Sequence, residues 1–185
     1  DVDDNGVLIY EDVNARPYDF TVKGDTRTYA DLQTPAGLAE IATYANGIGP
    51  WKPMILSTKT VDADKDGKPD DLNGDGVVNG QDRILSTPSS LVVDAHAKGL
   101  FVHAYTFRNE PRYLASSYAN NPQVEYATFY KLGVDGLFSD YPGSADLVRD
   151  QLGEVRSPQN PGVRISPEFK TLKGQTPIVI GHRGD

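Results

Sequence analysis

The clearest pattern of ligand-type side chains lies between residues 61 and 83, where aspartates and asparagines alternate with other residues. A first run of aspartates fills positions 1, 3, 5 and 9 of a calcium-loop pattern, with glycine at position 6: Asp62, Asp64, Asp66, Asp70 and Gly67. A second run overlaps it and fills positions 1, 3, 5, 9 and 12, again with glycine at position 6: Asp71, Asn73, Asp75, Asn79, Asp82 and Gly76. Calcium takes roughly six to eight oxygen ligands, and the glycine allows the sharp turn that directs them inward.

We interpret this acidic segment as a structural calcium-binding insertion. Residues 62–82 carry −5 of the chain's net charge of −8, because seven aspartates stand against Lys65 and Lys68, and this density of like charge favours a bound cation. Asp82 stands where a calcium loop usually has a bidentate glutamate, so that site is weaker or completed by water. A solvated acidic loop without metal is the alternative, which two overlapping patterns with both glycines in place disfavour.

The second loop, DLNGDGVVNGQD, resembles the calcium loop of dockerin modules, and the first resembles the Asp-rich loops of extracellular calcium repeats. A dockerin needs two such loops in tandem, each paired with a helix, and the sequence lacks that arrangement. We therefore expect no cohesin partner. The segment interrupts a connection between a strand and a helix, which favours a structural role for the metal over a catalytic one.

Composition limits the function classes that remain. The chain has 185 residues, 38% hydrophobic and 24% charged, which suits one globular domain or one domain with a fragment of another. The net charge of −8 without a basic run argues against nucleic-acid binding, and no apolar stretch is long enough for a membrane span. The sequence has no cysteine, which excludes disulfides and thiolate sites. The absence of cysteine is also usual in exported bacterial proteins, and we expect a periplasmic or secreted protein.

The remaining candidates for chemistry lie at the ends of apolar strands. His182 and Arg183 follow the strand predicted at residues 177–180, and Arg108 follows the strand predicted at 100–107, which contains Tyr105. Further strands are predicted at 7–10, 47–50 and 134–139, and helices at 34–45, 89–98, 124–132 and 144–152, with a loop at 11–32. Helices that end on glycine before a strand indicate βα units, and hence an α/β fold with a parallel sheet. Barrels of this class place their active sites directly after the strands.

Four stretches together resemble the glycerophosphodiester phosphodiesterase family. PIVIGHRGD is similar to the family's first strand and catalytic motif, GLFVHAYTFRNE to a late strand, and YKLGVDGLFSDYPGSADLVRDQL to the closing strand and helix. LAEIATYANGIGPWKPMI is similar to the preceding helix and strand of the periplasmic branch. These stretches cover most of residues 7–152 together with 177–185. The resemblance implies a TIM-barrel-type (β/α) fold, of which this chain holds too few strands for a whole barrel.

The order of these stretches differs from the family, because the late strands come first and the HRG strand comes last. We interpret residues 1–152 as the C-terminal half of one phosphodiesterase barrel, with the calcium-loop insertion at 61–83. Residues 153–176 then form a linker, and 177–185 supply the first strand and HRG motif of a second domain. Circular permutation is disfavoured, because the family's second to fifth strands have no counterpart here. The remaining barrel strands would come from the same or another chain.

The resemblance implies hydrolysis of a small-molecule glycerophosphodiester to glycerol 3-phosphate and an alcohol. A divalent cation, Ca2+ or Mg2+, would hold the phosphate and the glycerol hydroxyls at the catalytic site. By resemblance His182 is the catalytic histidine and Arg183 a phosphate contact, since a guanidinium offers a planar fork to phosphate. Tyr105 and Arg108 would line the substrate pocket of the first domain, in a different site from His182.

Simpler roles are weighed beside these. For Arg108, the sequence supports an ion pair with Glu110 or Asp140 nearly as well as it supports a contact with the substrate. His103 is expected to pack within its strand, and His96 to face solvent from its helix. The family's metal-binding carboxylates and second catalytic histidine cannot be assigned, so we expect the chain to be inactive alone. The alternative function is a non-catalytic, calcium-stabilised extracellular binding module.

Overall fold

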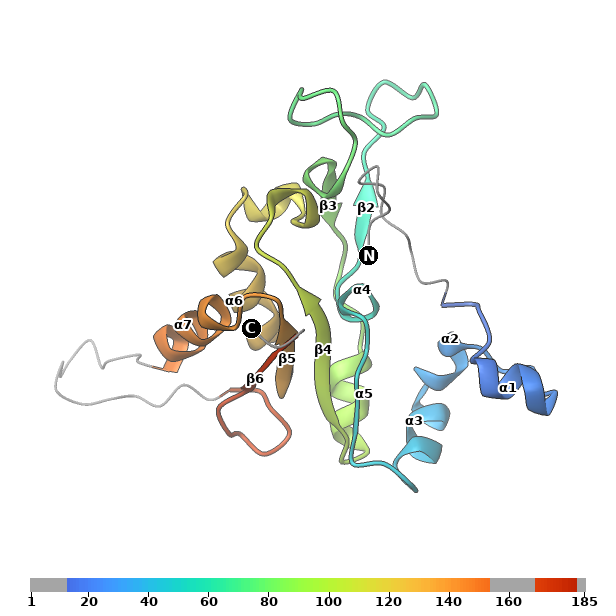
Figure 1. The fold of residues 1–185 in the computed structure, drawn as a ribbon. Helices are drawn as coiled ribbons and strands as arrows, with labels where there is room; N and C mark the ends of the chain where they lie inside the picture. Colours follow the sequence, from blue (N-terminus) through green and yellow to red (C-terminus); the bar gives the residue numbers. More distant parts are fainter. Residues whose placement is uncertain (1–12, 154–168, 183–185) are drawn as a thin grey trace, which may run out of the picture.

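The computed structural model describes residues 13–153 and 169–182 (Figure 1). Its α-helices are α1 (Tyr18–Lys23), α2 (Tyr29–Leu32), α3 (Pro35–Ile41), α4 (Lys52–Ile55), α5 (Leu91–Ala97), α6 (Pro122–Leu132) and α7 (Pro142–Gly153). Its strands are β1 (Gly47–Ile48), β2 (Thr58–Thr60), β3 (Arg83–Leu85), β4 (Phe101–Phe107), β5 (Gly136–Ser139) and β6 (Ile178–Gly181). The strand predicted at 7–10, Arg183 and residues 154–168 of the predicted linker lie outside the described residues. Within the described part, no helix has the length and apolarity needed to cross a membrane.

Four parallel strands form the main sheet, in the order β1-β4-β5-β6. Along the ladder Gly47 pairs with Phe101, His103 with Gly136, and Gly136 with Ile178. Helix α5 leads into β4, α6 leads into β5, and α7 lies between β5 and β6 in the sequence. The predicted α/β class with a parallel sheet is therefore confirmed. Among the described residues the sheet does not close, as expected for a partial barrel.

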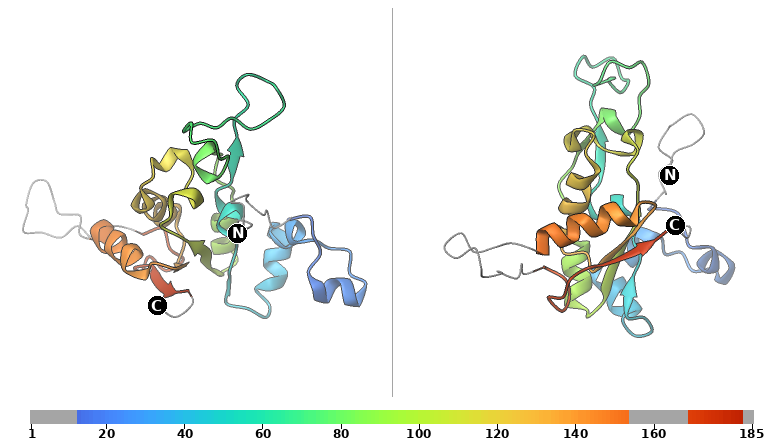
Figure 2. Two further views of the ribbon diagram at one scale, coloured as in Figure 1. Left: turned by 45° about the horizontal axis from the view of Figure 1, so that its top comes forward. Right: turned by 60° about the vertical axis from the view of Figure 1, so that its left-hand side comes forward.

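The hydrophobic core lies between one face of this sheet and helices α5, α6 and α7 (Figures 1 and 2). Val102, Ala104 and Leu137 point to this face and are fully buried. Because side chains alternate along a strand, His103 and Ile178 point to the opposite face. His103 is half-buried there and Ile178 is 48% exposed. In a closed barrel that opposite face is the barrel interior.

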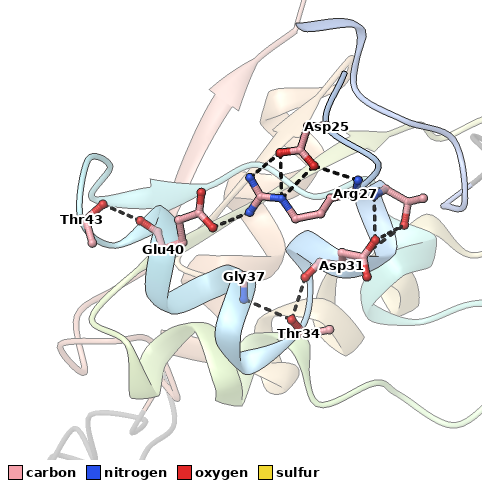
Figure 3. Close-up of polar contacts among 8 residues, drawn as sticks. Asp25, Arg27, Asp31, Thr34, Gly37, Glu40 and Thr43 are labelled. Carbon is pink, nitrogen blue, oxygen red and sulfur yellow. Dashed lines mark hydrogen bonds and ion pairs between the residues drawn. The ribbon is translucent and has the colours of Figure 1, made fainter. Parts of the chain in front are cut away.

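Helix α3 begins where the sequence predicts a helix start. Thr34 precedes the helix and Pro35 is its first residue. The Thr34 hydroxyl accepts a hydrogen bond of 3.1 Å from the Gly37 N–H (Figure 3). The cap satisfies an N–H that the first helical turn leaves free, and proline suits the first position because it has no N–H to satisfy.

The segment predicted as a loop at 11–32 instead contains α1 and α2. Thr28 and Asp31 form a capping box at the start of α2. Arg27 joins the segment to α3 through ion pairs with Asp25 and Glu40 (Figure 3). Neither helix buries a residue, so hydrophobic periodicity gives no signal for them, and local capping and ion pairs stabilise them instead.

Asp135, the residue before β5, forms hydrogen bonds at the amino-terminal ends of the parallel strands. Its Oδ2 accepts a hydrogen bond from the Val102 N–H and lies 2.8 Å from His96 Nε2, and its Oδ1 accepts one of 2.7 Å from the Leu172 N–H. The His96 side chain is only 16% exposed. The expectation that His96 faces solvent is therefore wrong, because the buried Asp135 carboxylate supplies a partner on the sheet side of α5.

The acidic segment leaves the domain as two loops, at the top of Figure 1. Its base is a two-stranded antiparallel sheet in which Thr58 pairs with Leu85 and Thr60 with Arg83. The Arg83 side chain donates a hydrogen bond of 2.8 Å to the Thr58 hydroxyl. The base thus holds the two ends of the insertion together beside the parallel sheet.

Candidate active site

A cavity of about 230 Å³ lies at the carboxyl ends of the parallel strands. Trp51 and Lys52 follow β1, Tyr105 lies near the end of β4, Arg108 follows β4, and His182 follows β6. Residues of α6 and of the segment after β4 complete its wall. Parallel strands gather their carboxyl ends at one edge of the sheet, which is where α/β folds place their active sites.

Asp140 connects the residues that follow two strands of this edge. Its Oδ1 lies 2.6 Å from Nδ1 of His182, and its Oδ2 lies 3.1 Å from Nε of Arg108. Two backbone hydrogen bonds hold the chain segments that follow the strands. The Asp140 N–H donates to the Phe107 carbonyl, and the His182 N–H donates to the Ser139 carbonyl. One carboxylate after β5 therefore orients both a histidine and an arginine toward a shared cavity.

This arrangement corrects one expectation from the sequence. Tyr105, Arg108 and His182 line a single cavity, so the structure does not separate His182 into a different site. The cause is the parallel pairing of β6 with β5, along which Ser139 lies beside Gly181. In a closed barrel the first strand lies beside the last, and β6 takes that place here. The catalytic and binding roles of these residues stay predictions, and Arg183 lies outside the described residues.

Arg108 makes both ion pairs that the sequence offers as the simpler explanation. Besides Asp140, its Nη2 lies 3.3 Å from Oε1 of Glu110. Its guanidinium also packs 4.3 Å from the centre of the Tyr113 ring. These contacts hold the side chain in place, yet it lines the cavity and is 26% exposed. Arg108 therefore places a fixed guanidinium at the cavity wall, where two carboxylates already pair with its charge.

The His182 imidazole is held in a way that suits proton transfer. Because a carboxylate accepts hydrogen bonds, Nδ1 carries the hydrogen of this contact with Asp140, and Nε2 takes no part in it. A histidine oriented by a carboxylate is a common general acid–base arrangement. With Arg108 on the same carboxylate, the site places an imidazole near a guanidinium, a group that can bind anionic oxygens.

A buried hydrogen-bond network supports this edge of the sheet. The Tyr126 hydroxyl lies 2.8 Å from the Ser139 hydroxyl and donates a bond of 3.0 Å to the Asn109 side chain. Burial raises the pKa of Tyr126 to about 12. The neutral phenol can therefore serve as a donor and acceptor between the segments that carry Arg108 and Asp140.

Lys52 and Glu125 are site residues that the sequence reasoning missed. Lys52 Nζ lies 2.7 Å from Glu125 Oε1, with side chains 15% and 4% exposed. Burial raises the pKa of the Glu125 carboxyl, and the nearby Lys52 ammonium opposes this shift. Lys52, two residues after the strand predicted at 47–50, was a usable signal. Glu125 carried none, because a glutamate in a helix is usually on the surface.

The structure brings one group of acidic side chains together well enough to hold a metal ion. Asp62, Asp64 and Asp70 offer carboxylate oxygens that all lie within 4.8 Å of one another. Gly67, at the predicted sixth position, has a φ of 85° that favours glycine. In residues 13–153 and 169–182 this is the one such group of three, and it lies in the first loop of the acidic segment.

The second predicted calcium loop uses its carboxylates mainly for backbone contacts. Asp71 accepts hydrogen bonds from the N–H groups of Gly74 and Gly76, which helps to lower its pKa. Asp82 is fully buried, and its two oxygens accept from the N–H groups of Leu72 and Asn79. Asp66 in the first loop, and Asn73 and Asp75 in the second, also accept backbone hydrogen bonds from within the loops. Calcium ligation by these residues stays a prediction.

The parallel sheet, with its polar cavity at the carboxyl ends of the strands, defines a partial TIM-barrel-type enzyme fold. Residues 7–144 match the glycerophosphoryl diester phosphodiesterase family, and the chain belongs to this family. The family membership inferred from the sequence is thus confirmed. The matched region ends before β6, and the dockerin-like loop stays a prediction.

Similar proteins from a plant carry the name of the same family. Glycerophosphodiester phosphodiesterase GDPD6 of Arabidopsis thaliana is 37% identical over 119 residues, which is 64% of this chain and 26% of that protein. Glycerophosphodiester phosphodiesterase GDPDL1 of the same plant is 30% identical over 132 residues, 70% of this chain and 14% of that protein. Glycerophosphodiester phosphodiesterase GDPDL5 is 43% identical over 61 residues, 31% of this chain and 8% of that protein. The chain therefore spans about a quarter or less of the length of these relatives.

Proposed function

We propose that the protein hydrolyses glycerophosphodiesters to glycerol 3-phosphate and an alcohol. The observation that carries the proposal is the Asp140 carboxylate, which holds His182 and Arg108 at one cavity in a chain of the phosphodiesterase family. The names of the Arabidopsis relatives point to the same activity.

The residues of the cavity have distinct roles in this proposal. Arg108 neutralises a phosphoryl oxygen, because charge on these oxygens must be stabilised during displacement at phosphorus. His182 transfers a proton through Nε2, taking it from the attacking group or giving it to the leaving alkoxide. Tyr105 lines the pocket, and Arg183 adds a second phosphate contact. A divalent cation, Ca2+ or Mg2+, is part of the proposal by family resemblance, with its ligands outside the described residues.

The direct test is release of glycerol 3-phosphate from a glycerophosphodiester by the natural protein, with and without a divalent cation. Substitution His182→Ala or Arg108→Ala should abolish turnover, while Arg149→Ala on α7, away from the cavity, should leave it intact. The 185-residue chain alone should bind the diester without hydrolysing it. Turnover that persists in both cavity variants would contradict the proposal.

Domain organisation and location belong to the same proposal. Residues 1–152 are proposed as the C-terminal half of one barrel and 177–185 as the first strand of a following unit, joined by 153–176. In this chain that strand pairs with β5, so His182 serves the same cavity as Arg108. The remaining barrel strands come from the same or another chain. The exposed face around Ile178, which a barrel would enclose, supports the need for further strands. A periplasmic or secreted location is proposed from the absence of cysteine and the aspartate-rich loops.

A second candidate function is a non-catalytic binding module stabilised by calcium. It is favoured by the convergence of Asp62, Asp64 and Asp70, together with the lack of such a group around the cavity among the described residues. Calcium binding to the loops without any diester hydrolysis by the natural protein would support this candidate. Hydrolysis that depends on His182 would exclude it.

A further inference from the structure

A buried ion pair forms part of the cavity wall beside the proposed phosphate site. Lys52, the first residue of α4, and Glu125 of α6 both line the cavity that Arg108 and His182 also line. The Glu125 side chain is 96% shielded from solvent, since only 4% of it is exposed. Ions are seldom buried in this way without a specific partner or role.

One carboxylate oxygen of Glu125 lacks a hydrogen-bond partner. Oε1 receives the Lys52 ammonium at 2.7 Å, whereas Oε2 is buried and has no partner among the described residues. Buried polar atoms are nearly always satisfied by protein, ordered water or a ligand, because leaving one unpaired is costly. Glu125 lines the cavity, so a small shift of the wall would bring Oε2 within reach of a hydrogen-bond donor bound there.

The charges around Oε2 select the kind of donor. The Lys52 ammonium already balances the carboxylate, and it is held further by the Phe107 ring, whose centre lies 5.4 Å from Nζ. A second cation at Oε2 would lie close to that ammonium and be repelled. A phosphate oxygen would be repelled by the carboxylate itself. A neutral hydroxyl group meets neither repulsion and donates one hydrogen bond.

We propose that the Lys52–Glu125 pair is a hydroxyl-binding subsite, which selects glycerophosphodiesters whose alcohol part carries a free hydroxyl group. The proposal rests on the proposed function, because it takes the phosphate to lie at Arg108 and His182. The two esters compared below share the glycerol part, so a preference between them assigns the hydroxyl at Glu125 to the alcohol. The aromatic side chains of Trp51 and Phe129 in the same wall suit the carbon chain of that alcohol.

Trp51 makes a binding test possible without catalysis. It is the single tryptophan of the chain and lines the cavity, so its fluorescence should report occupancy. Two esters of glycerol 3-phosphate are compared, the 2-hydroxyethyl ester and the propyl ester, which differ by a methyl group in place of the terminal hydroxyl. A hydrogen bond to a charged group predicts that the hydroxyethyl ester binds about tenfold more tightly, or better.

Two variants assign the preference to the ion pair. Glu125→Gln should reduce it to less than about threefold, because a neutral amide is a weaker acceptor. The double variant Lys52→Met with Glu125→Met replaces the pair by apolar side chains of similar length and should remove the preference. Glu40→Gln, which changes an exposed carboxylate on α3, is the matched control and should keep it. Thermal unfolding of each variant shows that it is folded.

The outcomes separate this inference from the function on which it rests. Equal binding of the two esters by the unmodified chain would overturn the hydroxyl subsite while leaving the diester site in place. A preference that survives in the folded double variant would also overturn it. If neither ester binds, the phosphate site at Arg108 and His182 of this chain is contradicted and the subsite falls with it, while release of glycerol 3-phosphate by the natural protein tests the proposed function separately.

Discussion

Nδ1 of His182 lies 2.6 Å from Oδ1 of Asp140, although the two residues are 42 positions apart in the chain. The register of the sheet explains the contact. Ser139 pairs with Gly181 at the ends of β5 and β6, so the next residue of each strand emerges at the same level. The candidate active site therefore depends on how β6 docks beside β5.

Gly136→Ala should weaken that docking. A Cβ at Gly136 would lie 2.6 Å from Cγ1 of Ile178 and 3.0 Å from the His103 ring. Overpacking of this kind costs about 1–3 kcal/mol, and Ile178, which the new Cβ would meet, belongs to β6. Hydrogen exchange at Ile178 to Gly181 should become faster in the variant. Gly143→Ala is the control, since its Cβ meets nothing within 4 Å, and unchanged exchange in both variants would contradict the predicted packing.

Asp140→Asn tests the shared carboxylate. The substitution keeps the shape of the side chain but removes the charge that orients His182 and Arg108. We expect affinity for the 2-hydroxyethyl ester, followed by Trp51 fluorescence, to fall about tenfold or more, as for loss of a charge-assisted hydrogen bond. Asp150→Asn, an exposed change on α7, should bind as the unmodified chain does. Equal affinities in the two variants would rule out the bridging role.

Glu125 should give the fold a defined pH dependence. Burial raises its pKa above the usual 4.5, so the folded state holds this proton more tightly than the unfolded state does. Its contribution to stability is therefore greatest below about pH 4.5 and is lost as the pH rises through the raised pKa. The free energy of unfolding of the unmodified chain, relative to Glu125→Gln, should decline across that window by at most about 1.4 kcal/mol per pH unit. A difference that rises with pH would contradict this assignment.

Calcium should stabilise the chain through the first loop. A ligand at about 100 times its Kd adds about 2.7 kcal/mol to the free energy of unfolding, which thermal unfolding with and without calcium would detect. The double variant Asp62→Asn with Asp64→Asn should lose this response. Asp146→Asn with Asp150→Asn removes two exposed carboxylates from α7 and is the matched control. A calcium response that is equal in both double variants would place the ion elsewhere.

Much of the fold could be predicted from local signals. Thr34 and Pro35 marked the start of α3, and glycines such as Gly133 marked the ends of helices that lead into strands. These signals act within one turn of the chain, so they can be read directly. The helices α1 and α2 were missed because exposed capping and ion pairs, rather than an apolar stripe, hold them.

The site was predicted residue by residue but not as one assembly. Tyr105, Arg108 and His182 were identified through the family resemblance of the strands that they end or follow. Their meeting at one cavity depends on the pairing of β6 with β5, a long-range contact that no local pattern encodes. Glu125 was missed for a related reason, since only tertiary packing buries its carboxylate beside Lys52.

The measurement that tests the central claim most directly is a double-mutant cycle between His182 and Arg108. Affinity for the 2-hydroxyethyl ester is measured by Trp51 fluorescence in the unmodified chain, in His182→Gln, in Arg108→Gln and in the double variant. Because both side chains share the Asp140 carboxylate at one cavity, their effects should be coupled by about 1 kcal/mol or more. Effects that add within about 0.5 kcal/mol, or a His182 variant that binds normally, would show that the two residues do not serve one site.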